Sequence, residues 1–357
     1  MPGILNKLDD YFRAVSAARD VHNVSAISAI NSVVAAKLVY GMGPRLHSLF
    51  GLSGVPRSDW KNFQKDADLE AVLAQLNPKS KRNISKDKIK FNQHCEKHGI
   101  PHIRTVYSDS QEPLLSDQAS RERFIQSIES GPDSLFFKFI DGAHGYGAFS
   151  AKRVDGTWHY AGQSGSVEDL YEFCQSNKGH NIGWLVQPEL KTHSDLRAIA
   201  SMEALSTARI VTCMTPAGPE VMFALFKLAR GDNPHDNFTL GSTGNMVAEI
   251  DIDTGTLGPA KGSLNSDYPS IMSFAIDPET GHKIAGRKMP FWAEAKQILL
   301  HAQGTLPDLK TLGWDLAITD DGPVVVETNT NYGGELVEIA YGRGLKPSFL
   351  EKLKTLV

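Results

Sequence analysis

The sequence predicts an α+β fold whose strands are mostly antiparallel, with a helical segment at its start. Three observations support this class. Apolar residues recur at helical spacing through the first eighty residues, and short strand-like runs take over from Ile103. Several of these runs form pairs separated by turn-forming residues, as in antiparallel hairpins. The last pair, within residues 312–331, has acids on one face and apolar side chains on the other. In a chain of 357 residues, we therefore expect two or three packed units.

The composition is that of a soluble globular protein, with 41% hydrophobic and 22% charged residues. A net charge of −4 gives no electrostatic reason to expect nucleic acid as a partner. Cys95, Cys174 and Cys213 show neither CxxC pairing nor ligand spacing with histidine, which favours inert thiols in a reducing compartment. Residues 1–20 carry too many charges for a secretory signal, and residues 24–52 are too interrupted to span a bilayer. We therefore expect a cytoplasmic protein without a transmembrane segment.

Residues 1–80 are expected to be helical, because two sets of apolar residues recur at helical spacing. The sets are Leu5, Leu8, Tyr11 and Phe12, and Ile27, Ile30, Val33, Val34 and Leu38. A further helix, Lys86–His98, is expected to end at Gly99, since glycine accepts the left-handed conformation that follows many helices. The first eighty residues are thus predicted to form a helical cap that buries Trp60 and Phe63.

A glycine-rich segment, Asp141–Gly147, lies between the strand-like runs Ser134–Ile140 and Ala148–Arg153. It lacks the lysine ending of a Walker A loop and the following helix of a dinucleotide fingerprint. A glycine-rich hairpin tip can still place backbone N–H groups over phosphates. Lys138 lies in an otherwise apolar strand, where a charge is costly unless it is paired, and phosphate is a natural partner. A plain structural turn is the alternative.

Basic residues recur in the two longer strands that follow, Ser206–Thr215 and Glu220–Arg230. Arg209 lies in the middle of the first strand among apolar neighbours. Lys227 and Arg230 lie at the end of the second, where a two-residue alternation would place them on opposite faces. We therefore expect one of them to join the other cations in a site. A surface ion pair is the alternative for each residue taken alone.

The chain closes with a predicted hairpin, in which the strands Trp314–Thr319 and Val324–Thr328 flank the turn-forming cluster Asp320–Gly322. A three-residue loop would pair Thr319 with Pro323. One face of the hairpin would then be entirely apolar, which supports this register. Its residues would be Trp314, Leu316, Ile318, Val324 and Val326.

On the other face of the hairpin, Asp315 would lie directly across from Glu327, with Asn329 two residues further along. Two facing carboxylates repel each other, and a divalent cation between them would reverse that effect. Three hard oxygen ligands suit Mg²⁺, which also binds phosphate oxygens. The hairpin therefore predicts a magnesium site, with a solvent-facing edge carrying unrelated acids as the alternative.

Taken in order, these motifs resemble the ATP-grasp superfamily, and most closely its sugar-transfer-associated group, over roughly Asn83 to Val357. The likeness is carried by TARIVT, DNFTLGSTGNMVAEIDIDTG, GWDLAI and the ETN of Glu327 to Asn329. The resemblance implies an ATP-grasp fold, two α+β subdomains that clasp ATP, over residues 81–357. Residues 81–188 would include the glycine-rich lid, and residues 189–357 would hold the metal site.

The resemblance also implies roles for individual residues. Those expected to contact the nucleotide are Lys88, Lys138, Gly142, His144, Gly145, Gly147, Gln187, Glu189, Leu190 and Asn237. Two of them have alternatives: His144 as a solvent-facing loop residue, and Asn237 as part of a turn with Asp236. The implied catalytic cations are Lys138, Arg209 and Arg230. The implied ligands of one or two Mg²⁺ ions, with Mn²⁺ as a substitute, are Asp315, Glu327 and Asn329.

The implied activity is a carboxylate–amine ligase that consumes ATP and forms an amide through an acyl phosphate. Its partners would be a small carboxylate, such as an amino acid or a sugar- or metabolite-linked acid, and an amine. A kinase of the same fold and a nucleotide-binding module without turnover are alternatives, and homo-oligomerisation stays open. Many relatives begin with a Rossmann-like domain, whereas residues 1–80 here are predicted helical. The cap is therefore expected to shape the acceptor side of the site, with a peripheral membrane anchor as its rival role.

Overall fold

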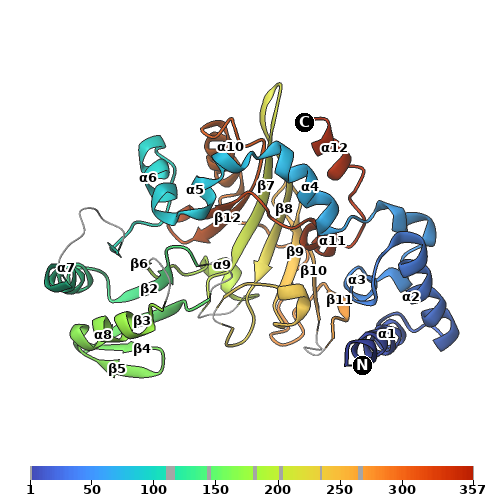
Figure 1. The fold of residues 1–357 in the computed structure, drawn as a ribbon, viewed down its shortest axis with the longest axis horizontal. Helices are drawn as coiled ribbons and strands as arrows, with labels where there is room; N and C mark the ends of the chain where they lie inside the picture. Colours follow the sequence, from blue (N-terminus) through green and yellow to red (C-terminus); the bar gives the residue numbers. More distant parts are fainter. Residues whose placement is uncertain are drawn as a thin grey trace.

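The computed structural model describes residues 2–109, 117–142, 146–179, 183–200, 204–233, 235–263 and 268–356. It contains an antiparallel sheet of six strands and another of seven, with helices packed around both (Figure 1). The predicted α+β class with mostly antiparallel strands is therefore confirmed. The first helices of the chain form a group at one end of the molecule, as Figure 1 shows.

The smaller sheet has the strand order β1-β6-β2-β3-β4-β5. Its strands are β1 (Tyr107–Ser108), β2 (Ser134–Phe139), β3 (Phe149–Val154), β4 (Thr157–Tyr160), β5 (Gln163–Gly165) and β6 (Trp184–Pro188). Helices α7 (Asp117–Glu129) and α8 (Val167–Asn177) cover one of its faces. Along β2, Leu135, Phe137 and Phe139 join the core beneath these helices. The alternation of a strand therefore turns Phe136 and Lys138 to the opposite face.

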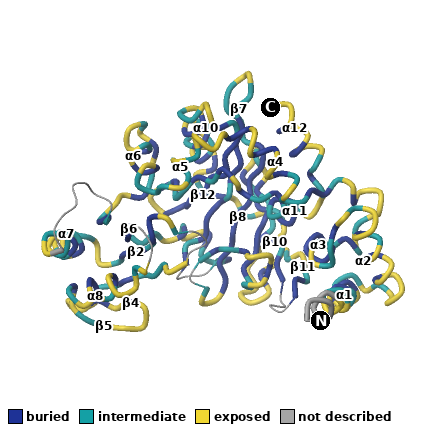
Figure 2. The backbone as a smooth tube through the Cα atoms, viewed as in Figure 1, coloured by how far each residue is buried: buried dark blue, intermediate teal, exposed yellow. Residues whose placement is uncertain are grey.

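The larger sheet has the strand order β11-β10-β9-β8-β7-β12-β13. Its strands are β7 (Thr207–Thr215), β8 (Gly218–Leu228), β9 (Met246–Ile250), β10 (Leu257–Ser263), β11 (Ile271–Phe274), β12 (Thr311–Thr319) and β13 (Gly322–Asn329). The buried centre of this sheet is visible in Figure 2. All nine residues of β12 are buried, because β7 and β13 flank it and both of its faces are covered.

Helices cover both faces of the larger sheet. On one face, α6 (Lys88–His98) and α10 (Trp292–Gly304) pack on a core that includes Ile210, Phe226 and Trp314. On the other, α3 (Pro44–Leu49), α4 (Asp66–Leu76), α11 (Gly334–Tyr341) and α12 (Leu350–Lys354) pack on a second core around Val211 and Phe223. The remaining short helices are α5 (Asn83–Lys86) and α9 (Ser194–Arg197). Gly99 ends α6 in the left-handed conformation, with φ of 64°, as predicted.

The N-terminal helices are α1 (Pro2–His22) and α2 (Ala26–Tyr40), followed by α3 and two 3-10 turns (Leu52–Gly54 and Arg57–Asn62). Trp60 and Phe63 are buried, as expected of a packed segment. The predicted packing face of α2 is wrong, because α2 packs through small residues and Val33, which allow close approach of α1. Four members of the predicted apolar set are exposed instead: Ile27, Ile30, Val34 and Leu38. Among the described residues, no helix is long and apolar enough to cross a membrane.

In the closing hairpin Asp315 faces Glu327 as predicted, although the turn differs from the predicted one. Thr319 pairs with Gly322 across a two-residue turn, so the predicted pairing with Pro323 is wrong. A register shift between Asp315 and Leu316 then adds one residue to β13, and Asp315 still faces Glu327. The same shift changes the apolar face. Val325 joins the core, whereas Val324 and Val326, predicted there, are only partly buried.

Candidate active site

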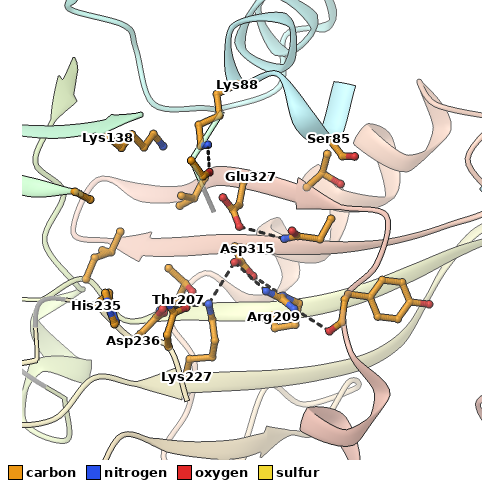
Figure 3. Close-up of a pocket in the computed structure, with 18 of the residues that line it drawn as sticks. Ser85, Lys88, Lys138, Thr207, Arg209, Lys227, His235, Asp236, Asp315 and Glu327 are labelled. Carbon is orange, nitrogen blue, oxygen red and sulfur yellow. Dashed lines mark hydrogen bonds and ion pairs between the residues drawn. The ribbon is translucent and has the colours of Figure 1, made fainter. Parts of the chain in front are cut away.

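A cavity of about 1070 Å³ lies between the two sheets. The smaller sheet contributes Phe136, Lys138 and Gln187 to its wall, and the larger sheet contributes strands β7, β8, β12 and β13. Helices α4, α6 and α11 also supply lining residues. Figure 3 shows that Lys88 and Lys138 approach from one side and Arg209 and Lys227 from the other. The cavity is therefore a place where charged side chains from distant parts of the chain converge.

Three charged residues form a row across neighbouring strands of the larger sheet. Asp315 on β12 pairs directly with Arg209 on β7 and with Glu327 on β13. Direct cross-strand partners point to the same face, and here that face lines the cavity. Asn329 lies two residues beyond Glu327 and also lines the cavity. The structure thus brings together all three predicted metal ligands.

Asp315 is held by two cations. Its Oδ1 accepts a hydrogen bond from Nε of Arg209 at 2.5 Å, and its Oδ2 accepts from Nη2 of Arg209 at 3.1 Å. The same Oδ2 accepts from Nζ of Lys227 at 3.2 Å. Burial by itself would raise the pKa of Asp315, but the charges and hydrogen bonds of Arg209 and Lys227 hold that pKa well below its usual range. Asp315 is therefore a buried carboxylate at neutral pH.

Lys227 connects Asp315 to a second buried acid. Its Nζ donates to Oδ1 of Asp236 at 3.1 Å, and Asp236 in turn accepts from the backbone N and the Oγ1 of Thr207 at 2.8 and 2.6 Å. Burial lowers the pKa of Lys227, but Asp236 and Asp315 outweigh it and leave the pKa raised. With Arg209, these residues form a network of two cations and two carboxylates, which is neutral as a whole.

Lys138 and Lys88 occupy the opposite wall. Among the described residues, Lys138 has no hydrogen bond or ion pair, and burial lowers its pKa to about 8 against the raising effect of Glu327. Lys88 donates from Nζ to the carbonyl oxygens of Ile140 and Gly142 at 3.1 and 2.6 Å. Burial also lowers the pKa of Lys88. These two cations are therefore less fully neutralised than those of the larger sheet.

The glycine-rich segment begins at the cavity. Gly142 lines it, whereas Gly147 does not. Gly147 has φ of +70°, and a Cβ there would lie 2.3 Å from the Phe139 ring, so this position requires glycine. The predicted contacts of His144 and Gly145 lie outside the described residues.

Gln187, Glu189 and Leu190 line another part of the cavity, at the end of β6. Gln187 Nε2 donates to the carbonyl oxygen of Ile103 at 3.0 Å, which leaves its buried Oε1 without a partner among the described residues. Glu189 accepts hydrogen bonds from the hydroxyls of Ser134 and Ser150. The acceptor that this wall offers to an occupant of the cavity is therefore the Glu189 carboxylate, because Gln187 Oε1 is fully buried.

Arg230 does not belong to this site, so its predicted catalytic role is wrong. It does not line the cavity, and it forms ion pairs with Asp277 and Glu279. Lys227 takes the place instead, since alternation along β8 directs it to the cavity. Asn237 lines the cavity, and its predicted contact with the nucleotide stays a prediction. Its neighbour Asp236, for which the sequence indicates only a turn, carries the contact to Lys227. A buried lysine needs a carboxylate partner, so Lys227 in an apolar strand is the sequence feature that indicates an acid such as Asp236 nearby.

The three predicted metal ligands can be compared with the needs of Mg²⁺. The described residues contain no group of three or more His, Cys, Asp or Glu that could hold a metal by themselves. Asp315 already accepts hydrogen bonds from two cations, and Nδ2 of Asn329 donates to Oε1 of Glu327 at 3.2 Å. Magnesium in phosphate-transfer sites commonly takes one or two carboxylates and fills its shell with phosphates and water. The set therefore fits Mg²⁺ delivered with a nucleotide, not an all-protein metal cage.

A further end of the cavity is acidic, where the N-termini of α4 and α11 meet. Asp66 Oδ1 accepts from the backbone N atoms of Gly334 and Glu335 at 2.7 and 2.9 Å. Glu335 Oε1 accepts from the backbone N of Asp66 at 3.0 Å, so each helix caps the other. Burial raises the pKa of both carboxyls. Asp66, Glu335 and Glu70 all line the cavity.

Comparison with known families gives a match over residues 70–355 to the family described as sugar-transfer associated ATP-grasp. A comparison with curated proteins found no match. Solved structures with some likeness include D-alanyl-alanine synthetase A from Vibrio cholerae, at 12% identity and a TM-score of 0.42, covering 75% of this chain and 60% of that one. The D-alanine–D-alanine ligase of Helicobacter pylori is 10% identical, with a TM-score of 0.41 and coverages of 77% and 59%.

The biotin carboxylase of Campylobacter jejuni is also 10% identical, with a TM-score of 0.42, and the match covers 80% of this chain and 52% of that one. The chain thus spans between about half and three-fifths of the length of these three proteins. Because the TM-scores lie below 0.5, the family assignment rests on the sequence match alone.

Proposed function

The chain belongs to the sugar-transfer associated ATP-grasp family, and we propose that it is an ATP- and Mg²⁺-dependent carboxylate–amine ligase. The observation that carries this proposal is the convergence of cations from both walls on the pair Asp315 and Glu327. A triphosphate is the ligand that such a cavity suits, because it can pair with Lys88, Lys138 and Arg209 at once. The Glu189 carboxylate, an acceptor on the cavity wall, fits the amino group of adenine.

In the proposed reaction, a carboxylate oxygen of the substrate attacks the γ-phosphorus of ATP, and the bond to the β-phosphate oxygen breaks to release ADP. An amine then attacks the acyl carbon, and phosphate leaves as the amide forms. Asp315, Glu327 and Asn329 would hold Mg²⁺, which would supply Lewis-acid stabilisation of the phosphate oxygens. The protein's own task is to position the reactants and neutralise charge, which is what phosphoryl transfer requires.

Each cation has a distinct part in the proposal. Arg209 is fixed by Asp315 and donates from Nη1 to the carbonyl oxygen of Tyr332 at 3.0 Å, so its guanidinium offers a rigid contact for the transferred phosphate. Lys138 has no partner among the described residues and would gain one when phosphate arrives. Lys88 donates hydrogen bonds to the carbonyl oxygens of Ile140 and Gly142, at the start of the glycine-rich segment. If Lys88 turned from these carbonyls to a phosphate, the segment would be free to close as a lid.

We further propose that the acceptor amine enters at the acidic end, beside Asp66, Glu70 and Glu335. A protonated amine is attracted to these carboxylates. Since Asp66 and Glu70 lie on α4, the N-terminal helical segment would contribute residues to the acceptor side of the site. In reactions with a metabolite extract, Glu70→Gln should lower amide formation and leave formation of the activated carboxylate unchanged. Equal losses of both would contradict this placement.

Hydroxylamine trapping tests the ligase proposal. The protein is incubated with ATP, Mg²⁺ and a metabolite extract, with and without hydroxylamine, and Glu327→Gln serves as the matched control. A hydroxamate that depends on ATP and is missing in the control would support an acyl phosphate. A stable phosphoester in place of the hydroxamate would favour a kinase of the same fold. This measurement is needed because the residues that line the cavity suit both a kinase and a ligase. Nucleotide binding without any product would favour a module without turnover.

A further inference from the structure

The N-terminal helices α1 and α2 each carry exposed apolar residues on one face, and the two faces together are called the stripe. Its most exposed members are Phe12 and Ile27, each 74% exposed, and Leu38, at 79%. Leu8, Ile30 and Val34 complete it. Within each helix these residues are three or four positions apart, so each set lies on one face. The two helices pack against each other at one end of the molecule, and Figure 2 shows exposed segments along their outer side.

The stripe is not needed for folding. α1 and α2 pack through Ala14, Ala17 and Val33, together with Tyr268. α2 also buries Ala29, Ser32 and Ala36. A helix with apolar residues on both its packed and its exposed face is unusual in a protein that meets only water, and a large exposed apolar surface typically marks an interaction site.

Charge is distributed unevenly along the chain. Residues 1–65 contain eight Lys or Arg and four Asp or Glu, a net charge of +4, although the whole chain carries −4. Arg19 lies seven residues after Phe12, and Lys37 lies seven residues after Ile30, so each shares the face of the stripe. Both are exposed, and among the described residues neither has an ion pair. The two helices themselves, residues 2–40, contain four Lys or Arg and three Asp, a net charge of +1, and Asp20 lies next to Arg19. The positive charge that lies on the face of the stripe and has no ion pair in the described part of the chain therefore comes from Arg19 and Lys37, in a molecule whose remainder is negative.

We propose that α1 and α2 form a docking surface for an anionic lipid bilayer, with the stripe in the interface and Arg19 and Lys37 against lipid headgroups. Interfacial binding of this kind combines buried apolar area with attraction to anionic lipids. The negative remainder of the chain would be repelled, so the charge asymmetry orients the molecule with its N-terminal helices toward the membrane. The cavity would then stay in the aqueous phase.

A second copy of the chain fits this surface less well. A symmetric dimer would bring Arg19 and Lys37 of two copies to one interface, and like charges across an interface oppose association. A bilayer requires no matching groove, whereas a dimer requires a complementary surface. The charge at the stripe therefore favours the bilayer over a second copy.

Vesicle flotation of the full chain tests the proposal. The parent should float with phosphatidylcholine vesicles that contain phosphatidylserine, and much less with phosphatidylcholine alone. The double variant Phe12→Gln and Leu38→Gln should bind on the order of 100-fold more weakly, and Arg19→Gln with Lys37→Gln roughly tenfold more weakly. The matched control is Val154→Gln with Ile276→Gln, which removes two other exposed apolar side chains, at 54% and 57%, and should bind as the parent does.

Three outcomes would overturn the proposal: no binding of the parent to anionic vesicles, undiminished binding of the Phe12 and Leu38 variant, or an equal loss in the control. Sedimentation of the same proteins tests the alternative that a second copy of the chain covers the stripe. A parent dimer that the Phe12 and Leu38 variant converts to monomer, without vesicle binding, would identify a second copy of the chain as the occupant. None of these measurements depends on ATP, so they stand apart from the proposed ligase activity.

Discussion

Arg209 and Lys227, on the wall formed by the larger sheet, lie in ion pairs with buried acids, whereas Lys138, on the opposite wall, has no partner among the described residues. The first arrangement is preorganised: its charges are neutralised before any ligand arrives. The second is incomplete, because a partly buried lysine pays for desolvation without a compensating contact. The larger sheet therefore supplies a rigid surface, and the smaller sheet supplies groups whose contacts a ligand completes.

The largest expected effect comes from replacing Lys227, on the wall of the larger sheet, with methionine. Lys227→Met should lower the free energy of unfolding by about 3–5 kcal/mol, because it leaves Asp236 and Asp315 buried with one cation fewer. Denaturant unfolding at pH 7 measures this. A loss below about 1 kcal/mol would show that the network behaves like a surface ion pair and would remove the contrast between the walls.

Glu327→Gln should reduce turnover by about 100- to 1000-fold with little change in stability, since Glu327 is outside the buried ion-pair network and its charge is expected to serve bound Mg²⁺ and phosphates. ATP- and Mg²⁺-dependent hydroxamate formation is the readout. Asp315→Asn is a less clean test of metal binding, because it also breaks the contacts to Arg209 and Lys227. Activity of Glu327→Gln within tenfold of the parent would contradict its role.

Lys138→Met should have the opposite effect to Lys227→Met on stability. It should raise the free energy of unfolding at pH 7 by about 1 kcal/mol, because it removes an unpaired, partly buried charge. The same variant should bind ATP roughly tenfold or more weakly, since it loses a charged hydrogen bond to phosphate. Unfolding and nucleotide titration measure the two effects. A variant less stable than the parent would mean that Lys138 is already satisfied without ligand.

The stability difference between Lys138→Met and the parent should also depend on pH. The pKa of Lys138 is about 8 in the folded protein against an ordinary 10.5. Between these values the unfolded chain holds a proton that the folded chain has lost, so the parent gains stability as pH rises. The advantage of Lys138→Met should therefore shrink from pH 8 toward pH 10.5. A difference that stays constant over this range would exclude Lys138 as the titrating group.

The smallest and most local effect concerns the glycine-rich segment 142–147. Hydrogen exchange there should slow when an ATP analogue and Mg²⁺ are added, because a glycine-rich tip that closes over phosphates loses much of its freedom. Strand β12 is the internal reference, since it is buried throughout and should not change. Slow exchange in both states would identify the segment as a structural turn.

Much of the site could be predicted because it depends on local alternation. A lysine at position 138 among apolar neighbours, an arginine at 209 and the acids at 315 and 327 each lie on a strand with a period of two residues. That period places Asp315 across from Glu327 in the hairpin, and the pairing is confirmed. The predicted three-residue turn is wrong, and Asp315 faces Glu327 only because a one-residue register shift follows the shorter turn.

The sequence alone determined the α+β class, the antiparallel strands and the helical start, since these follow from short-range periodicity and turn chemistry. Only the tertiary structure decided which of Lys227 and Arg230 reaches the cavity and which face of α2 stays exposed. The physical reason is that burying a charge or an apolar face depends on partners far away in the chain. Lys227 pairs with Asp315 and Arg230 with Asp277, and these acids lie in distant segments that no local pattern connects to the two cations.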